Sequence, residues 1–118
     1  MATRFELVLE DDKVCFVLRA ADGKLLLQGV GGGRGKITAQ NEILHVRRAL
    51  QSPEHLVPHQ AQDGTHFFVV KEDSGEVLAR SPHVASASQL AALTQQIVTA
   101  AASAPIVDLT KRPRATTS

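Results

Sequence analysis

The chain has 118 residues, of which 43% are apolar and 21% charged, a composition typical of one globular domain. A formal net charge of +1 and an aromatic set of four Phe without Tyr or Trp argue against a strongly basic nucleic-acid binder and a stacking platform for single strands. A single cysteine excludes an internal disulfide, and no run approaches the roughly 20 apolar residues of a transmembrane helix. Acidic residues also stand where a signal peptide needs its apolar core, so we expect a cytoplasmic protein that does not bind membranes.

The first predicted strand spans residues 4–9. Phe5, Leu7 and Leu9 alternate with polar residues, so these three side chains should share one face. Asp11-Asp12 follows and is best interpreted as a turn, because carboxylates that act as general acid and base need burial to separate their pKa values.

A β-hairpin is predicted around Asp22-Gly23, a pair that separates two apolar runs. A two-residue turn at this pair would place Leu18 opposite Leu27 and Val17 opposite Gln28. This is the strongest local signal in the chain.

The two faces of this hairpin differ in composition. The face that carries Phe16 and Leu18 is the expected core face. The other face carries Cys15, Val17 and Leu26, so we expect the second half of the chain or a second chain to cover part of it. Cys15 lies among apolar residues without a nearby base, which favours a packed thiol over an activated nucleophile.

Residues 29–36, GVGGGRGK, contain five glycines and predict a mobile loop. A phosphate-binding loop would need Gly where Val30 stands and Ser or Thr where Ile37 stands, so a connector is the favoured interpretation. Arg34 and Lys36 remain candidate contacts for an anion at the start of the following helix.

A helix is predicted for residues 37–50, with Thr38 as its N-cap and an end just before Ser52-Pro53. Its apolar positions follow the helical period. They are Ala39, Ile43, Val46 and Leu50.

The pattern returns 52 residues later and indicates a tandem repeat. We expect a single domain of residues 1–110, with repeat one at 4–52, repeat two at 55–103 and a disordered tail at 111–118. Each half alone is too small to bury a sufficient core, so the halves should share one. The corresponding positions are Phe16 and Phe68, Gly23 and Gly75, and Leu26 and Leu78.

The second repeat begins with a strand at 55–60, which Pro58 restricts to the edge of a sheet. A hairpin of residues 66–72 and 76–80 follows, and Ser86 or Ser88 caps a helix that runs to about Ala101. Residues 106–109 either add a strand or pack on the core. The apolar stripe of the second helix is Leu90, Leu93, Ile97 and Ala101.

The pattern Phe-x-Leu-x-Ala-x-Asp-Gly of residues 16–23, followed by Ala-x-Asn-x-Ile-x-x-Val of residues 39–46, resembles the YegP-like family of small bacterial proteins, a domain of unknown function. The resemblance implies an α+β fold, with tandem β-β-β-α repeats forming one antiparallel sheet and two helices on one face. It implies no catalytic residues. Family members have a Ser-x-x-Tyr-like segment between hairpin and helix, and the chain departs from it in both copies. The glycine loop replaces it in the first copy, and Ser81-Pro82-His83-Val84 lacks the Tyr ring in the second.

No motif in the chain indicates an enzyme, a cofactor or a metal. His55 and His59 have the spacing of a helical metal-ligand pair, but Pro58 argues against a helix there. We therefore expect no catalytic, cofactor-binding or metal-binding residues.

The leading hypothesis is a non-enzymatic module that binds another protein or associates with itself, through exposed sheet edges or the second face of the sheet. The alternative is a weak binder of nucleic acid or another polyanion. It would use the tail and four basic residues, Arg34, Lys36, Arg47 and Arg48.

Overall fold

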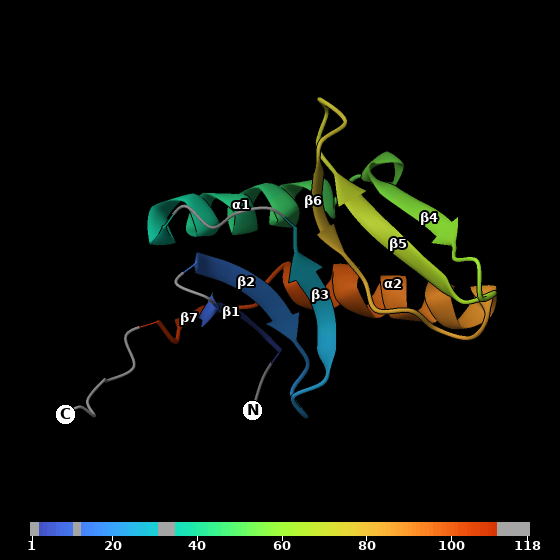
Figure 1. The fold of residues 1–118 in the computed structure, drawn as a ribbon, viewed down its shortest axis with the longest axis horizontal. Coiled ribbons are helices and arrows are strands. Elements are labelled where there is room, and N and C mark those ends of the chain that lie inside the picture. The colour runs from blue at the N-terminus through green and yellow to red at the C-terminus, as the bar shows by residue number, and fades with distance from the viewer. Residues whose placement is uncertain (1–2, 11–12, 31–34, 111–118) are drawn as a thin grey trace.

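The computed structural model describes residues 3–10, 13–30 and 35–110, which form one seven-stranded sheet and two α-helices (Figure 1). The α+β class predicted from the sequence is confirmed. The order of strands across the sheet is β4-β5-β6-β3-β2-β1-β7. In chain order the elements are β1 (Arg4–Glu10), β2 (Lys13–Arg19), β3 (Leu25–Gly29), α1 (Lys36–Ala49), a 3₁₀ turn (Pro53–His55), β4 (Leu56–Gln60), β5 (His66–Lys71), β6 (Val77–Arg80), α2 (Ala87–Ala101) and β7 (Ile106–Asp108).

Strand β7 makes the sheet mixed. It runs parallel to β1, with Phe5 paired to Ile106, whereas the other neighbouring strands are antiparallel. The chain reaches this position after α2, where the Phe5 amide donates to the carbonyl of Pro105 at 2.8 Å. The prediction of a fully antiparallel sheet is therefore wrong at this edge, and of the two alternatives for residues 106–109 the added strand is the correct one.

The hairpin tip between β2 and β3 is a three-residue loop and not the predicted two-residue turn. The Ala20 amide donates to the carbonyl of Lys24 at 2.8 Å, and the Gly23 amide donates to the carbonyl of Ala20 at 2.9 Å. Gly23 has a φ of 91°, the left-handed value that this type of loop requires at its last residue.

A bulge in β3 compensates for the longer loop. Leu26 is an extra residue in β3, and the one-residue shift in register that it causes cancels the shift caused by the longer loop. The predicted pairs of Leu18 with Leu27 and of Val17 with Gln28 are therefore confirmed. Leu26 itself joins the core cluster, whereas the sequence placed it on the other face.

The hairpin of β5 and β6 has the same geometry. The Glu72 amide donates to the carbonyl of Glu76 at 3.0 Å, and Gly75 again has a φ of 91°. The register shifts once more next to Val70, and Leu78 is the extra residue. Both bulge residues, Leu26 and Leu78, are buried.

The two helices begin differently. Gly35 is the N-cap of α1 and makes no side-chain cap, so the predicted cap, Thr38, lies inside the first turn. The main chain itself starts this helix, since the Ala39 amide bonds to the carbonyl of Gly35. Ser86 caps α2 as predicted, with its hydroxyl accepting from the Gln89 amide at 3.1 Å. Within the described ranges, neither helix is long and apolar enough to cross a membrane.

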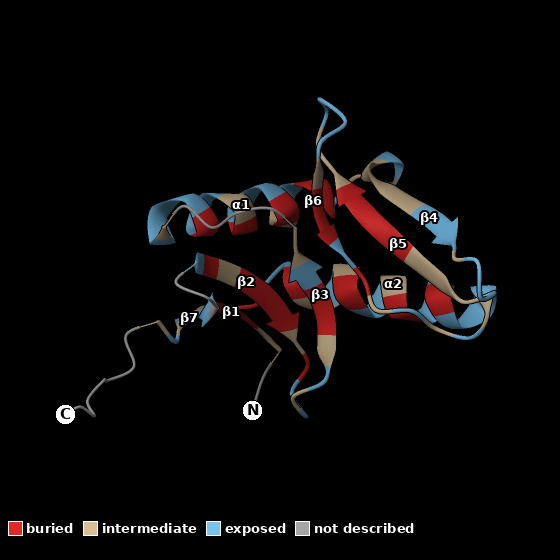
Figure 2. Ribbon diagram, viewed as in Figure 1, coloured by how far each residue is buried: buried red, intermediate tan, exposed pale blue. Residues whose placement is uncertain are grey.

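One hydrophobic cluster contains buried residues of both helices and of the sheet (Figure 2). Phe16 and Phe68, from the two predicted repeats, are both in it. Leu9 is an exception to the predicted pattern, because it is 56% exposed at a part of β1 that extends beyond its pairing with β7. All eight apolar positions predicted for the helices are buried, namely Ala39, Ile43, Val46, Leu50, Leu90, Leu93, Ile97 and Ala101.

Candidate functional site

An apolar groove lies between the β4 edge of the sheet and α2. Pro58 places β4 at this edge, as predicted, and its side chains become exposed toward the end of the strand (Figure 2). The groove has a volume of about 450 Å³, and no Asp, Glu, Lys or Arg from the described part of the chain lines it. Its lining residues are Leu56, Pro58, His66, Phe68, Ala87, Leu90, Ala91, Thr94 and Gln95.

The hydrogen bonds of β5 indicate which backbone groups of β4 are free to pair with another strand. His66 exchanges two 2.8 Å hydrogen bonds with Val84, and the carbonyl of Phe68 accepts from the Ser81 amide at 2.9 Å. The Phe68 amide donates to the Ser81 hydroxyl, also at 2.9 Å. His66 and Phe68 thus direct their backbone groups away from β4.

Because successive residues of a strand point their backbone groups in opposite directions, the residue between them, Phe67, faces β4. Its partner His59 is therefore hydrogen-bonded to β5, and so is Val57. The backbone groups of the intervening residues, Leu56, Pro58 and Gln60, face outward along the open edge. These three residues also carry the side chains on the groove side of β4.

Three rings are stacked on the other side of the sheet: His59 of β4, Phe67 of β5 and His83 of the segment after β6. The Phe67 ring lies between the imidazoles of His59 and His83, with centroid distances of 5.4 Å and 4.6 Å. The Thr65 hydroxyl donates to Asp63 at 2.6 Å, so it accepts from Nδ1 of His83 at 2.8 Å, which fixes that ring. The hydrogen bonds from Thr65 lower the pKa of Asp63 below its ordinary value.

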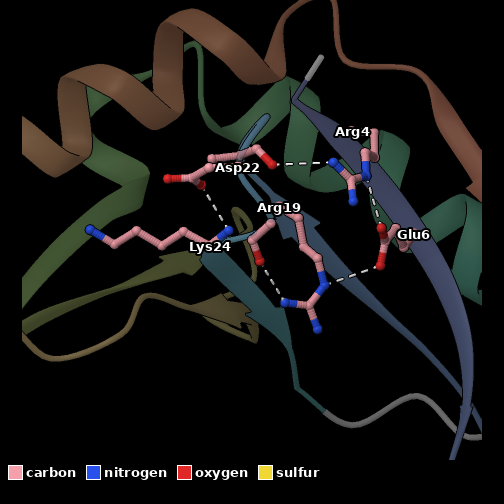
Figure 3. A network of polar contacts seen from close by, with 7 residues as sticks. Arg4, Glu6, Arg19, Asp22 and Lys24 are labelled. Carbon is pink, nitrogen blue, oxygen red and sulfur yellow. Dashed lines mark hydrogen bonds and ion pairs between the residues drawn. The ribbon is translucent and has the colours of Figure 1, made fainter. Parts of the chain in front are cut away.

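At the opposite end of the sheet, a buried carboxylate holds two strands together. Glu6 accepts from Nε of Arg4 at 2.8 Å and from Nε of Arg19 at 3.1 Å, and Figure 3 shows the carboxylate between the two guanidinium groups. Arg4 also donates to the carbonyl of Ala20, and Arg19 to that of Gly23. The network thus ties β1 to the hairpin tip.

Among the described residues, the predicted anion contacts Lys36, Arg47 and Arg48 lie in different surroundings. Arg34 lies outside the described residues, and Lys36 at the start of α1 pairs with Asp108 at 3.2 Å. Arg47 points toward the end of α2, where it donates to the carbonyls of Ala101 and Ala104. Its guanidinium also lies 5.5 Å from the ring centre of Phe5. Arg48 is exposed near the other end of α1.

Arg48 belongs to a small polar hollow of about 140 Å³. Nε2 of His55 lies 2.7 Å from a carboxylate oxygen of Asp73 in this hollow, and Glu72 and His45 complete it. Nearby, burial and then the Glu76 charge raise the pKa of Glu42, while His45 lowers it. Acidic and basic side chains both line the hollow, so it selects neither sign of charge.

The two histidines of the predicted ligand pair are in different environments. His55 ends the 3₁₀ turn, whereas His59 lies in β4 and stacks on Phe67. Among the residues that the structure describes, no group of three or more His, Cys, Asp or Glu could hold a metal ion. Cys15 lies half-buried in β2, opposite Val8. The predicted turn at Asp11-Asp12 and the predicted tail lie outside the described residues.

Sequence reasoning missed the groove and the ring stack. Pro58 indicated an edge strand, but no local pattern indicates that α2 leaves β4 uncovered. The prediction from aromatic content considered only Phe, Tyr and Trp, whereas two of the three stacked rings are imidazoles.

No protein-family model and no curated protein matches the chain. Two solution NMR structures are similar to it. A UPF0339 protein from Shewanella oneidensis superimposes with a TM-score of 0.86 at 22% identity, over 97% of each chain. The protein of unknown function yegP from E. coli superimposes with a TM-score of 0.84 at 25% identity, over 93% of this chain and 95% of its own. These neighbours are of unknown function and indicate no specific partner. The resemblance that the sequence indicated is thereby confirmed, and the chain has the fold of the YegP-like proteins.

Proposed function

We propose that the chain is a non-enzymatic protein-binding module that adds an extended segment of a partner protein to the β4 edge. The observation that carries the proposal is the position of the open backbone groups of Leu56, Pro58 and Gln60 directly beside an apolar groove. Peptides that bind by strand addition use both features: backbone hydrogen bonds give affinity, and pockets for alternate side chains give specificity.

Because of Pro58, the binding of a partner strand at the β4 edge should depend on contacts in the groove. Without an N–H, Pro58 offers an incoming strand only its carbonyl, so the edge lacks one donor between Leu56 and Gln60. Backbone pairing alone is therefore weakened, and a stable complex needs apolar contacts in the groove. Since none of the described Asp, Glu, Lys and Arg residues lines the groove, the alternate side chains of the partner segment are uncharged and largely apolar.

The tandem organisation is part of the same proposal. The two hairpins share a loop, a left-handed glycine and a bulge at positions 52 residues apart, which supports two β-β-β-α repeats. In this view the groove is a feature of repeat two, where β4 is at the edge. The corresponding strand of repeat one, β1, is instead covered by β7. We also propose the cytoplasmic location that the sequence predicts.

A substitution that fills the groove tests the proposal. Ala91 lines the groove and is exposed, so Ala91→Arg introduces a long side chain without changing the core. Ala92→Arg is the matched control, because Ala92 is the next residue on α2, is also exposed, and does not line the groove.

The measurement is selection from a random peptide library on the full chain, followed by titration of the enriched peptides. We expect peptides with alternating apolar residues, bound at least about tenfold more weakly by Ala91→Arg and with unchanged affinity by Ala92→Arg. Equal affinity for both variants, or no enriched peptide, would contradict the proposal. A dimer of the chain that Ala91→Arg abolishes in sedimentation would also contradict it, since the occupant would then be a second copy.

A further inference from the structure

One row of residues crosses the whole sheet on the side opposite the core. Each member is paired in register with the next, and no member belongs to the core cluster, which contains all the buried residues of both helices. We call this side the open face; Gln28, Arg80 and Val107 are its exposed row members, whereas Glu6, Val17 and Val69 are buried. The row, from β4 to β7, is Val57, Val69, Arg80, Gln28, Val17, Glu6 and Val107.

We infer that the open face binds a single-stranded nucleic acid. The inference rests on other residues than the predicted anion contacts and goes beyond the proposed protein-binding function, which uses the groove on the opposite side of the sheet.

Charge supports this inference. The row contains two charged residues, Glu6 and Arg80. One carboxylate oxygen of Glu6 accepts from Arg4 and the other from Arg19, so Glu6 is already paired. Lys71 lies on the same face, two residues beyond Val69 in β5. Among the described residues, neither Arg80 nor Lys71 makes an ion pair. Arg80 is therefore a positive charge within the row that no acidic side chain in the described part of the chain pairs with.

A hollow marks the position for a phosphate group. It has a volume of about 260 Å³ and lies where β3 meets β6, lined by Gln28, Gly29, Val30 and Arg80. Arg80 is exposed and presents a planar guanidinium with several donors, and the Gln28 amide can add another. Gln28 and Arg80 come from the two different halves of the chain, so the hollow exists only where the halves meet.

The ring stack supplies surfaces for bases. Phe67 is two residues from Val69, the β5 partner of Arg80, so the stack lies about 7 Å along the strand from the hollow. His59 and His83 are exposed on either side of Phe67, and imidazoles are among the side chains on which single-stranded bases stack. Such stacking is tolerant of sequence, because every base has a π-face.

These two features together favour a single strand over other anions. A free phosphate would use the hollow without the rings, and a duplex keeps its bases stacked on each other. The Asp63 carboxylate at the far side of His83 repels phosphate there, so the backbone of the strand lies toward Arg80 and its bases toward the imidazoles.

The test is fluorescence anisotropy of the full chain with a labelled oligouridine over a range of salt concentrations. We expect Arg80→Gln to weaken binding roughly fivefold to tenfold and to reduce the salt slope by about one. His83→Ala should weaken binding by a similar factor and leave the slope unchanged, since a base contact releases no counterion. Arg48→Gln, an exposed cation outside the open face, is the matched control and should change nothing.

Three results would overturn the inference: no binding by the unmodified chain, equal loss in Arg80→Gln and Arg48→Gln, or equal competition by uridine monophosphate and by the single strand. If the first result is accompanied by loss of a selected peptide in Arg80→Gln, the open face belongs instead to the protein partner. Ala91→Arg and Ala92→Arg should affect oligouridine binding equally. A failure of the groove proposal therefore leaves this test intact.

Discussion

The ring of Phe16 lies so close to the main chain of Gly29 that a Cβ atom at position 29 would come within 2.4 Å of the ring carbon Cε1. Gly29 ends β3 and pairs with Ala79 of β6, at the seam between the two halves of the sheet. The ring is almost completely buried and cannot move aside without displacing its core neighbours. The absence of a side chain at Gly29 thus allows the largest type of side chain in the core to pack under the seam.

We expect Gly29→Ala to lower the free energy of unfolding by about 1–3 kcal/mol, the usual cost of overpacking a core. Urea denaturation of the single variant, of Phe16→Leu and of the double variant measures this. Because Phe16→Leu removes the ring carbons Cε1 and Cζ, two of the three atoms that clash, the double variant should be more stable than the sum of the two changes predicts. Strict additivity would show that the two residues do not conflict.

Arg47 and Arg48 should differ in their effect on stability. Arg47 binds carbonyls at the end of α2 and lies over Phe5, so we expect Arg47→Gln to cost about 1–3 kcal/mol in the free energy of unfolding. Arg48→Gln, at the neighbouring exposed position, should cost less than about 0.5 kcal/mol. Thermal and urea unfolding of both variants would check this, and equal losses would contradict the structural role of Arg47.

Asp108 should make the stability of the folded chain depend on pH in the acidic range. The Thr110 hydroxyl donates to Asp108 at 2.5 Å and, together with the Thr110 amide and Lys36, lowers the pKa of Asp108 from 3.8 to about 2. A carboxyl whose folded pKa is depressed stabilises the protein above its unfolded pKa, and this contribution is lost as the pH falls toward the folded value.

We therefore expect the unmodified chain to lose stability between about pH 4 and pH 2, and Asp108→Asn to lose less over the same range. Melting temperatures of the two proteins at a series of pH values measure the difference. Parallel curves would mean that the contacts of Asp108 with Thr110 and Lys36 contribute nothing to the acid sensitivity.

The first half of the chain should not fold by itself. Phe68, Val70 and Ile97 from the second half are almost completely buried in the cluster that also holds Phe16. A fragment of residues 1–52 lacks these partners, and about 50 residues bury too little surface to compensate for the loss. We expect an unfolded fragment or a dimer by sedimentation and circular dichroism. A monomer with a cooperative thermal transition would contradict a shared core.

The hairpin shows how far the sequence determines the fold. Alternation and Asp22-Gly23 predicted the strands and the pairing of Leu18 with Leu27, yet the turn type was wrong. A three-residue loop and a bulge at Leu26 give the same pairing as a two-residue turn, so the alternation pattern cannot distinguish them. The helical stripes were predictable because helix periodicity is local.

The candidate sites were less predictable because they depend on distant segments. The sequence offered Arg47 as a contact for a polyanion, but Arg47 donates to carbonyls at and just after the end of α2, more than fifty residues later. The β7 strand and the groove likewise depend on where α2 begins and ends relative to β1 and β4. No local pattern contains that information.

The most direct measurement of strand addition is amide hydrogen exchange in β4, with and without a peptide selected on the full chain. Strand addition predicts that the amides of Leu56 and Gln60, which face the open edge, exchange more slowly when the peptide is bound. The amides of Val57 and His59 already bond to β5 and should change little. A bound peptide that leaves Leu56 and Gln60 unprotected, or that slows all four amides equally, would contradict the account.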